Sequence, residues 1–272
     1  MDELVIEAGR TERQYWRDLW HYRELFFFLA WRDLLIRYKQ TVVGVAWALI
    51  RPALAILVVT FVGQVAKLSA GGVPHALFAA CGVLPWQFFS TALSESGNSL
   101  VNNSNLISKV YFPRLVAPAS SVITSFVDFL ITGAFVGILM IWFHFAPPAN
   151  IWVLPAFVLL AFAASFGAGL WIAALMVKYR DFRFIVPFIV QFGLYASPVI
   201  ESTSDVHGKW QRLIFCLNPV AGIIDGFRWC LLGHDNIIYW PGLISSIAGV
   251  ILLVLTGIWY FRKTERTFAD VI

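Results

Sequence analysis

Charged residues are scarce in this chain: Asp, Glu, Lys and Arg make up 13% of its 272 residues. A soluble globular domain carries about 25%, so the scarcity excludes an ordinary soluble domain. Hydrophobic residues make up 59% of the chain, and the mean hydropathy is +0.74. Apolar runs of about 20 residues recur, each long enough to cross a hydrocarbon core about 30 Å thick. They do not alternate as the strands of a membrane barrel do, and they predict an all-α polytopic membrane protein.

Motifs of catalysis are also missing. The chain has no G-x-x-x-x-G-K-[ST] phosphate loop, no H-E-x-x-H, no G-x-S-x-G and no paired-cysteine motif. Its five histidines are scattered, and its three cysteines lack metal-type spacing. We therefore expect no enzymatic step, no metal site and no cofactor bound by this chain. The net charge of +4 is spread along membrane edges rather than gathered in one patch, so we expect no nucleic-acid partner.

Two other classes of membrane protein remain open at this point. A glycosyl- or acyltransferase needs an acid or histidine site at one membrane face, and His234-Asp235 is the nearest pair. An ion-gradient-driven transporter or flippase usually shows inverted repeats, and no clear repeat is present. Cys216 and Cys230 lie in one connecting segment, and they could pair if that segment faces an oxidising compartment.

Six membrane spans are predicted from the apolar runs. They cover residues 42–66, 77–98, 116–143, 151–177, 184–200 and 243–261. Most of the 20 Lys and Arg lie in the N-terminal segment, in the 99–115 turn, between the fourth and fifth spans, and after the sixth. The positive-inside rule places these segments and both termini in the cytoplasm.

The N-terminal segment 12–39 is a separate element. It interleaves aromatic residues with arginines, among them Arg32 and Arg37, and predicts an amphipathic helix that lies in the headgroup layer. A soluble helix packed on a partner is the alternative. Asp33 and Arg37 have the spacing of an i,i+4 ion pair, in the favourable order.

The segment 201–242 is more apolar than an exported loop of that length should be. Its apolar stretches are too short to span, and Asn218-Pro219 breaks them. Two short re-entrant helices at the outer face fit this pattern, because irregular backbone at membrane depth is tolerated inside protein or beside water. A small folded external domain is the alternative.

A polar and basic turn, NLISKVYFPR, runs from Asn105 to Arg114 between two long apolar segments. Lys109 and Arg114 require that it lies in water. Together with Tyr111 they offer a docking surface to a cytoplasmic partner. The alternative is a solvated loop that obeys only the charge rule for membrane topology.

Arg51 lies about ten residues into the first span, where a charge is costly and points to a function. It can face an anionic substrate, or pair with Glu95 or Asp128 of a neighbouring helix. For Asp128 itself we expect a structural pair with a basic or hydroxyl neighbour. Trp47, one turn before Arg51, is a candidate for the substrate path.

An aromatic stripe runs along the fifth span. Phe184, Phe188, Phe192 and Tyr195 recur at i, i+4, i+8 and i+11, which puts them on one helical face. Aromatic rings stack on the apolar faces of sugars, so the stripe is a candidate surface along which a glycan slides. Ordinary helix packing is the alternative.

Five blocks of sequence together resemble the permease subunits of type-2 ABC transporters that export polysaccharides, O-antigen exporters most closely. They are WRDLLIRYKQTVVGVAWALIRP, LPWQFFSTALSESGNSLVNNSNLISKVYFPR, KYRDFRFIVP, LNPVAGIIDGFR and FRKTERTFADVI. The resemblance covers nearly the whole chain. It implies a homodimer of six-span protomers and two copies of a separate cytoplasmic ATPase subunit, which binds ATP and Mg. Capsule and teichoic-acid exporters share overlapping motifs and stay open.

The same resemblance implies export of a lipid-linked polysaccharide across the bacterial inner membrane. It makes the 12–39 helix and the 94–114 region the coupling surface to the ATPase. The resemblance also implies that the first and fifth spans line the channel and that the 201–242 helices gate the outer end of the channel. The expected coupling residues are Asn105, Lys109, Tyr111, Arg114, Arg32 and Arg37, and the expected pathway residues are Trp47, Arg51, Phe184, Phe188, Phe192 and Tyr195.

Overall fold

The computed structural model describes residues 19–39, 46–107, 109, 112–206, 208–233, 238–265 and 268. Within these residues every regular element is a helix, so the predicted all-α fold class is confirmed. The 12–18 part of the predicted interface helix, Tyr111 and His234-Asp235 lie outside the described residues.

Among the described residues, five helices are long and apolar enough to cross a membrane. They are α3 (Ala46–Val65), α4 (His75–Asn102), α6 (Val116–Trp142), α7 (Leu154–Lys178, preceded by the short 3-10 helix η1, Ala149–Val153) and α11 (Trp240–Glu265). At 1.5 Å rise per residue, even the 20 residues of α3 reach about 30 Å. These helices fall within a few residues of five of the six predicted spans.

The remaining apolar helices are shorter. Helix α8 (Phe182–Tyr195) has 14 residues and a length of about 21 Å, less than the hydrocarbon core is thick. Helices α9 (Lys209–Leu217) and α10 (Ala221–Leu232) meet at 92°, and Asn218-Pro219 lies in the break. The prediction of two short helices in this segment is confirmed. A sixth span is reached only if this bent pair counts as one, so the number six stays a prediction.

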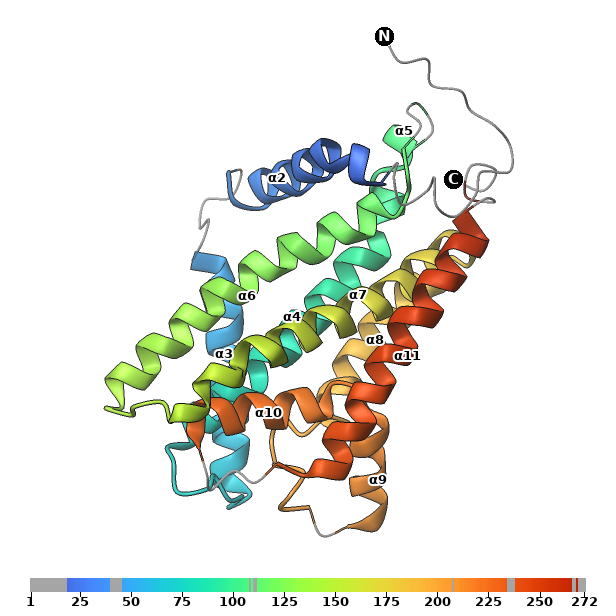
Figure 1. The fold of residues 1–272 in the computed structure, drawn as a ribbon. Helices are drawn as coiled ribbons and strands as arrows, with labels where there is room; N and C mark the ends of the chain where they lie inside the picture. Colours follow the sequence, from blue (N-terminus) through green and yellow to red (C-terminus); the bar gives the residue numbers. More distant parts are fainter. Residues whose placement is uncertain are drawn as a thin grey trace.

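Helix α4 forms the centre of the bundle (Figure 1). It packs against α3, α6, α7 and α10, and 78% of its span window is buried. A group of aromatic rings holds this centre together, namely Phe88, Phe126, Phe129, Phe162 and Phe227. The other four long helices bury a third of their windows or less. Their outer faces remain apolar and suit contact with lipid or with another membrane chain.

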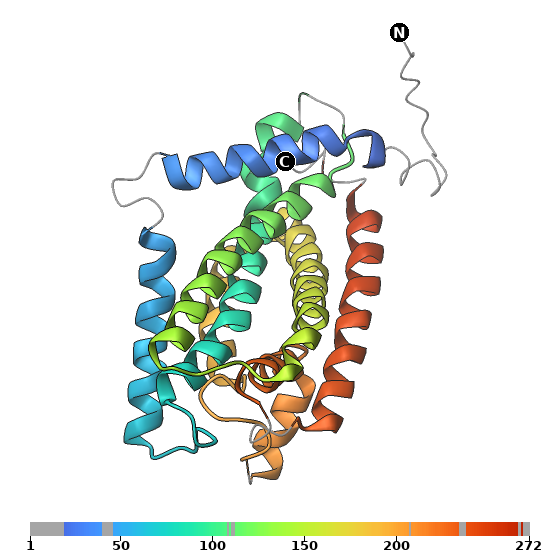
Figure 2. The same ribbon diagram turned by 60° about the vertical axis from the view of Figure 1, so that its left-hand side comes forward.

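Helix α2 (Arg23–Lys39) crosses the end of the bundle instead of running along it, as Figure 2 shows. One face buries Leu29 against Phe112 and Val116. The opposite face exposes large aromatic rings, among them Phe27 and Trp31. A helix with one apolar exposed face and one packed face fits the expected position in the headgroup layer.

Helices α7 and α11 approach each other closely through glycines. A Cβ built on Gly257 lies 2.5 Å from the carbonyl oxygen of Gly167, and one on Gly167 lies 2.7 Å from the backbone nitrogen of Val254. Beside this contact the Trp171 ring stacks on Tyr260 with 4.3 Å between ring centroids. Small residues let membrane helices pack this closely, and close packing is the main attraction between them.

Candidate functional site

Four polar side chains meet where α2 rests on the bundle, and we call them the Arg37 cluster: Arg37, Tyr38, Glu95 and Asp128. The Arg37 Nη2 donates to Glu95 Oε1 on α4 at 2.6 Å, and its Nη1 donates to Asp128 on α6. The Tyr38 hydroxyl donates to the other carboxylate oxygen of Asp128. One guanidinium thus fastens α2 to two membrane helices, using the fork of donors that makes arginine suited to paired acceptors.

Tyr38 remains protonated in this position. Burial raises the pKa of its phenol, and the hydrogen bond to Asp128 and the carboxylate's charge raise it further. The phenol therefore acts as a hydrogen-bond donor throughout the ordinary pH range. The expectation that Asp128 pairs with a basic or hydroxyl neighbour is confirmed, because it has one of each.

All four residues of the cluster line a first cavity of about 410 Å³. Arg51 and Trp47 of α3 line it, with the Arg51 guanidinium 6.0 Å from the centroid of the Trp47 ring. Glu95 and Asp128 line the same cavity, but their partner is Arg37. The pairing of Arg51 with either carboxylate, left open by the sequence, is therefore not formed in this structure.

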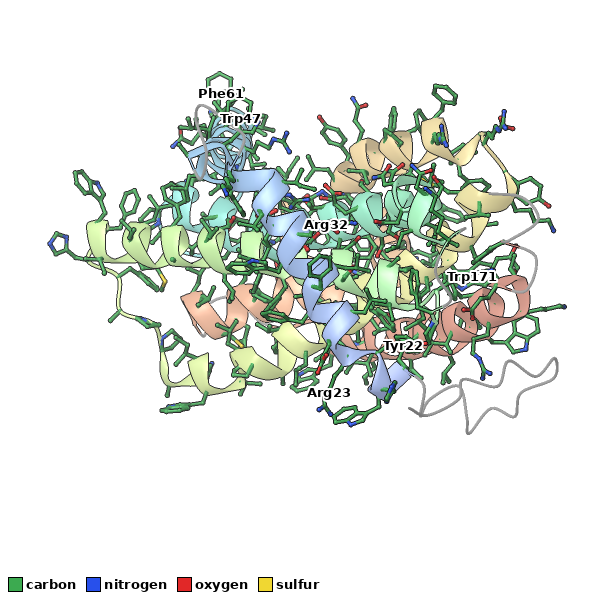
Figure 3. All side chains as sticks on the ribbon, turned by 90° about the horizontal axis from the view of Figure 1, so that it is seen from above. Tyr22, Arg23, Arg32, Trp47, Phe61 and Trp171 are labelled. Carbon is green, nitrogen blue, oxygen red and sulfur yellow. The ribbon has the colours of Figure 1, made fainter. Side chains whose placement is uncertain are left out.

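A second cavity has a volume of about 490 Å³, and Arg37 and Glu95 line both cavities. Arg32 occupies its wall and donates to Asn103 Oδ1 at 2.6 Å and to Asp33 at 2.7 Å. Figure 3 shows Arg32 midway along α2, where the helix crosses the bundle. The predicted i,i+4 pair of Asp33 with Arg37 is wrong, because Arg32 binds Asp33 and the two bundle carboxylates bind Arg37.

The aromatic stripe on α8 faces outward. Its rings expose 82% (Phe184), 59% (Phe188), 53% (Phe192) and 67% (Tyr195) of their surface, while the helix buries only Val186. The Phe188 and Phe192 rings contact each other with 4.2 Å between centroids. The four rings therefore do not pack the core of this chain, which weakens the packing alternative. That a glycan follows this face stays a prediction.

The predicted coupling residues separate into two kinds. Lys109 is exposed next to the short helix α5 (Ser104–Ile107), which also carries the exposed Asn105. Arg114 is engaged within the chain: its backbone N–H donates to Glu265 Oε1 at 2.9 Å and its guanidinium to the Glu265 carbonyl. Arg114 also lies 5.9 Å from the centroid of the Phe268 ring. It ties the turn to the end of α11, so Lys109 is the better probe of a docking surface.

A buried arginine, Arg228 of α10, was not predicted from the sequence, and 0% of its surface is exposed. It donates to the carbonyl oxygens of Pro198 and Val199 at 2.5 Å each, and its guanidinium lies 3.8 Å from the centroid of the Phe78 ring. Asp225, one turn earlier, is 3.9 Å away. The i,i+3 spacing of an acid and a base within the apolar stretch IIDGFRW is a sequence signal from which this buried pair could have been predicted.

Gly82 of α4 makes room for this guanidinium, because a Cβ there would lie 2.5 Å from Arg228 Nη2. Arg228 therefore joins α10 to α4 and to the backbone that follows α8. The cysteines of the region, Cys81, Cys216 and Cys230, are free. Within the described residues no group of three or more His, Cys, Asp and Glu side chains has the spacing to hold a metal ion.

These features define a class: a multi-pass helical membrane protein with a charged cluster between a transverse helix and its membrane helices. Within that class the chain belongs to the ABC-2 type transporter family, whose sequence model matches residues 24–232. The matched part runs from α2 to the end of α10. It therefore contains the Arg37 cluster, both cavities, the aromatic stripe and the buried arginine.

The chain is also similar to relatives that carry the name O-antigen export system permease protein RfbA. One from Myxococcus xanthus is 27% identical over 259 residues, which cover 94% of this chain and 98% of the relative. Two from Klebsiella pneumoniae are 23% and 24% identical over 257 residues, covering 92% of this chain and 95% of each relative. The similarity therefore extends over almost the full length of this chain and of each relative.

Proposed function

We propose that this chain is the permease subunit of an ABC transporter that exports a lipid-linked polysaccharide of the O-antigen type across the bacterial inner membrane. One observation carries the proposal: the chain aligns over 94% of its length with a permease named for O-antigen export. Its membership of the ABC-2 type transporter family agrees with this role. Its sequence has no phosphate-binding loop, so ATP and Mg bind to a separate ATPase subunit.

The proposed assembly is a homodimer with two ATPase subunits on the cytoplasmic side. The bundle end that carries α2, α5 and the last turn of α11 is the cytoplasmic one, because Lys and Arg gather there. The outward-facing apolar sides of α3 and α8 support a second protomer as neighbour, since a channel between two copies needs faces that the single chain leaves free.

The proposed cycle begins when a lipid-linked glycan enters from the cytoplasmic leaflet and its phosphate head meets the basic residues near α2 and Arg51. ATP binding in the partner then moves α2 and the 94–114 region. The channel opens, and the glycan passes Trp47 and the aromatic stripe while α9 and α10 open the outer end. A differential affinity of a few kcal/mol is sufficient to shift such a two-state gate.

The direct test is gentle detergent purification of the tagged chain from its host, followed by mass spectrometry of what accompanies it. We expect a stoichiometric ATPase subunit and a lipid-linked glycan. Lys109→Glu should lower the recovered ATPase severalfold, because the variant reverses the charge of an exposed side chain at the proposed docking surface.

Lys67→Glu is the matched control, since Lys67 is exposed at the opposite end of the bundle. It should recover the ATPase as the wild type does. A chain without ATPase in several detergents and with nucleotide present would move the function to a gradient-driven transporter. A capsule or teichoic-acid polymer on the lipid would keep the permease role and change the substrate.

The aromatic stripe provides a second test. Replacing both Phe188 and Phe192 with alanine should slow polymer export about tenfold or more. The reason is that a stacking energy of about 1 kcal/mol per aromatic ring is lost at each of the two positions. The protein should fold normally, because both rings are exposed in the single chain and do not pack its core. Export is measured as surface polymer per inserted permease.

Trp152→Ala is the control for this pair, because Trp152 is 87% exposed on η1 and away from the stripe. It should export at the wild-type rate. If the variant with alanine at both Phe188 and Phe192 folds and exports at the normal rate, the stripe only faces lipid and does not guide the glycan.

A further inference from the structure

Two arginines from different elements line the first cavity together with a single pair of carboxylates. Arg37 comes from α2 and Arg51 from α3, while Glu95 and Asp128 come from α4 and α6. Two positive and two negative charges therefore face one space. In this structure their pairing is uneven, because Arg37 binds both carboxylates.

This uneven pairing leaves charge on both sides of the cavity. One guanidinium neutralises one of two carboxylates, so the Arg37 cluster keeps one excess negative charge. Arg51 carries the balancing positive charge, and within the described residues no carboxylate lies at ion-pair distance from it. Opposite charges attract more strongly across a space of low dielectric than across bulk water. The arrangement thus favours a second pairing in which each arginine holds one carboxylate.

The space between the two charges is suited to such a movement. The wall of the first cavity carries the hydroxyl groups of Thr91, Ser125 and Thr132. It also carries Gln87, whose buried Oε1 has no hydrogen-bond partner. This oxygen is an acceptor within the cavity for a guanidinium that moves inward. Arginine has a long and flexible stem, and Arg51 is exposed where α3 borders the cavity.

We propose that Asp128 exchanges between Arg37 and Arg51, so that the two arginines act as alternating positioning residues for the membrane helices. In the pairing described here Asp128 ties α6 to α2. In the alternative pairing Asp128 ties α6 to α3, and Arg37 keeps only Glu95. A displacement of α2 is thereby converted into a movement of α3, the helix that carries Trp47.

The exchange conserves the number of ion pairs, which keeps the two states close in free energy. Arg37 holds Glu95 in both, and Asp128 has a guanidinium partner in both. A transition that left Asp128 unpaired beside the membrane core would be far more costly. An input at α2 can therefore select either state. That this input comes from an ATPase rests on the proposed function, whereas the exchange itself concerns the permease alone.

The experiment measures the separation of α3 and α6 in the full chain, reconstituted in nanodiscs without any ATPase. Spin labels are attached at Leu54→Cys on α3 and Leu130→Cys on α6, in a background where the three native cysteines are replaced. Both leucines are exposed, and neither lines the cavity. The pairing of Arg51 with Asp128 should bring the two labels closer.

Neutralising the two arginines should have opposite effects. Arg37→Gln frees Asp128 for Arg51 and should raise the ratio of short to long distances about tenfold, while Arg51→Gln should lower it by a similar factor. Arg51→Lys keeps the charge and should stay near the wild type. If Arg37→Gln does not fold, Arg37→Lys replaces it and should shift the ratio in the same direction by less, because lysine lacks the fork that holds two carboxylates.

A general loosening of the structure would shift both glutamine variants in the same direction. That result, or no shift in either variant, overturns the exchange. Asp128→Asn supplies a further check, because it should make the distances insensitive to Arg51→Gln. A nucleotide response measured afterwards with the ATPase present tests the proposed function separately, and its failure would leave the opposite shifts of the permease alone unaffected.

Discussion

Replacing Arg228 with leucine is expected to abolish accumulation of the folded protein. The guanidinium is fully buried and supplies hydrogen bonds to the carbonyl oxygens of Pro198 and Val199. Leucine fills part of the volume of the arginine side chain. It leaves the two carbonyl oxygens without a hydrogen-bond donor and the Asp225 carboxylate without its counter-ion. Breaking a buried ion pair costs about 3–5 kcal/mol, which is a large fraction of the roughly 5–15 kcal/mol by which a typical domain is stable. Size-exclusion chromatography of a fluorescent fusion measures the folded fraction.

Lys209→Leu is the control for this substitution. It removes a basic residue from the same bent helix pair, but Lys209 is exposed at the start of α9. Its folded fraction should match the wild type. An Arg228→Leu protein that elutes as a single symmetrical peak at the wild-type level would mean that Arg228 is not a structural anchor of α10.

Gly257→Val is expected to separate α7 from α11 and to remove most of the folded protein. The obstacle is backbone, since an added Cβ meets the Gly167 carbonyl oxygen at 2.5 Å. Rotamer changes cannot relieve that contact, so one helix must move. The movement would also break the hydrogen bond of 3.0 Å from Trp171 to Thr256. Overpacking typically costs 1–3 kcal/mol and more where the backbone is involved, so we expect a loss of about 3 kcal/mol.

Gly137→Val makes the same change where there is space. Gly137 lies within α6, and apart from the adjoining backbone of its own helix a Cβ there would meet no heavy atom within 4 Å. The variant should fold as the wild type does and lose little thermal stability in detergent. Equal melting temperatures for the Gly257 and Gly137 variants would contradict the assignment of the α7–α11 contact as a close-packed interface.

The sequence predicted the secondary-structure elements better than it predicted the ion-pair partners of the charged side chains. The break between α9 and α10 follows from Asn218-Pro219, because a proline cannot continue the preceding turn. The gathering of the four α8 rings on one face follows from their spacing. Both features depend on residues close together in the chain, where helical periodicity is a direct guide.

The ion pairs depended on packing that no local pattern records. Asp33 has the right spacing to pair with Arg37. The Arg37 guanidinium instead donates to Glu95 and Asp128, which are 58 and 91 residues away from Arg37 in the chain. The two bundle carboxylates lie partly inside the bundle, where an unpaired charge is more costly than one in water. Leaving one of these carboxylates unpaired therefore costs more free energy than leaving a surface aspartate unpaired, because a surface ion pair contributes little.

The same reasoning explains why Arg114 was assigned to the docking surface. The sequence around it predicts a solvated turn, but Phe112 and Leu115 are buried, and the partner Glu265 is 151 residues away at the end of α11. Arg228 was missed for a related reason: its acceptors are backbone oxygens, which every residue carries. Only the turn after α8 brings the two carbonyl groups toward α10.

The buried position of α4 has a consequence for biogenesis. Its best window has a mean hydropathy of 1.4, whereas the other four long helices range from 1.9 to 2.2. Serines such as Ser96 and Ser99 are tolerated in α4 because protein rather than lipid surrounds them. A helix emerging from the ribosome has none of those neighbours, and on an insertion scale it is the weakest candidate to leave the translocon alone. We therefore expect stable insertion of α4 to depend on α6 and α7, which cover it in the finished bundle.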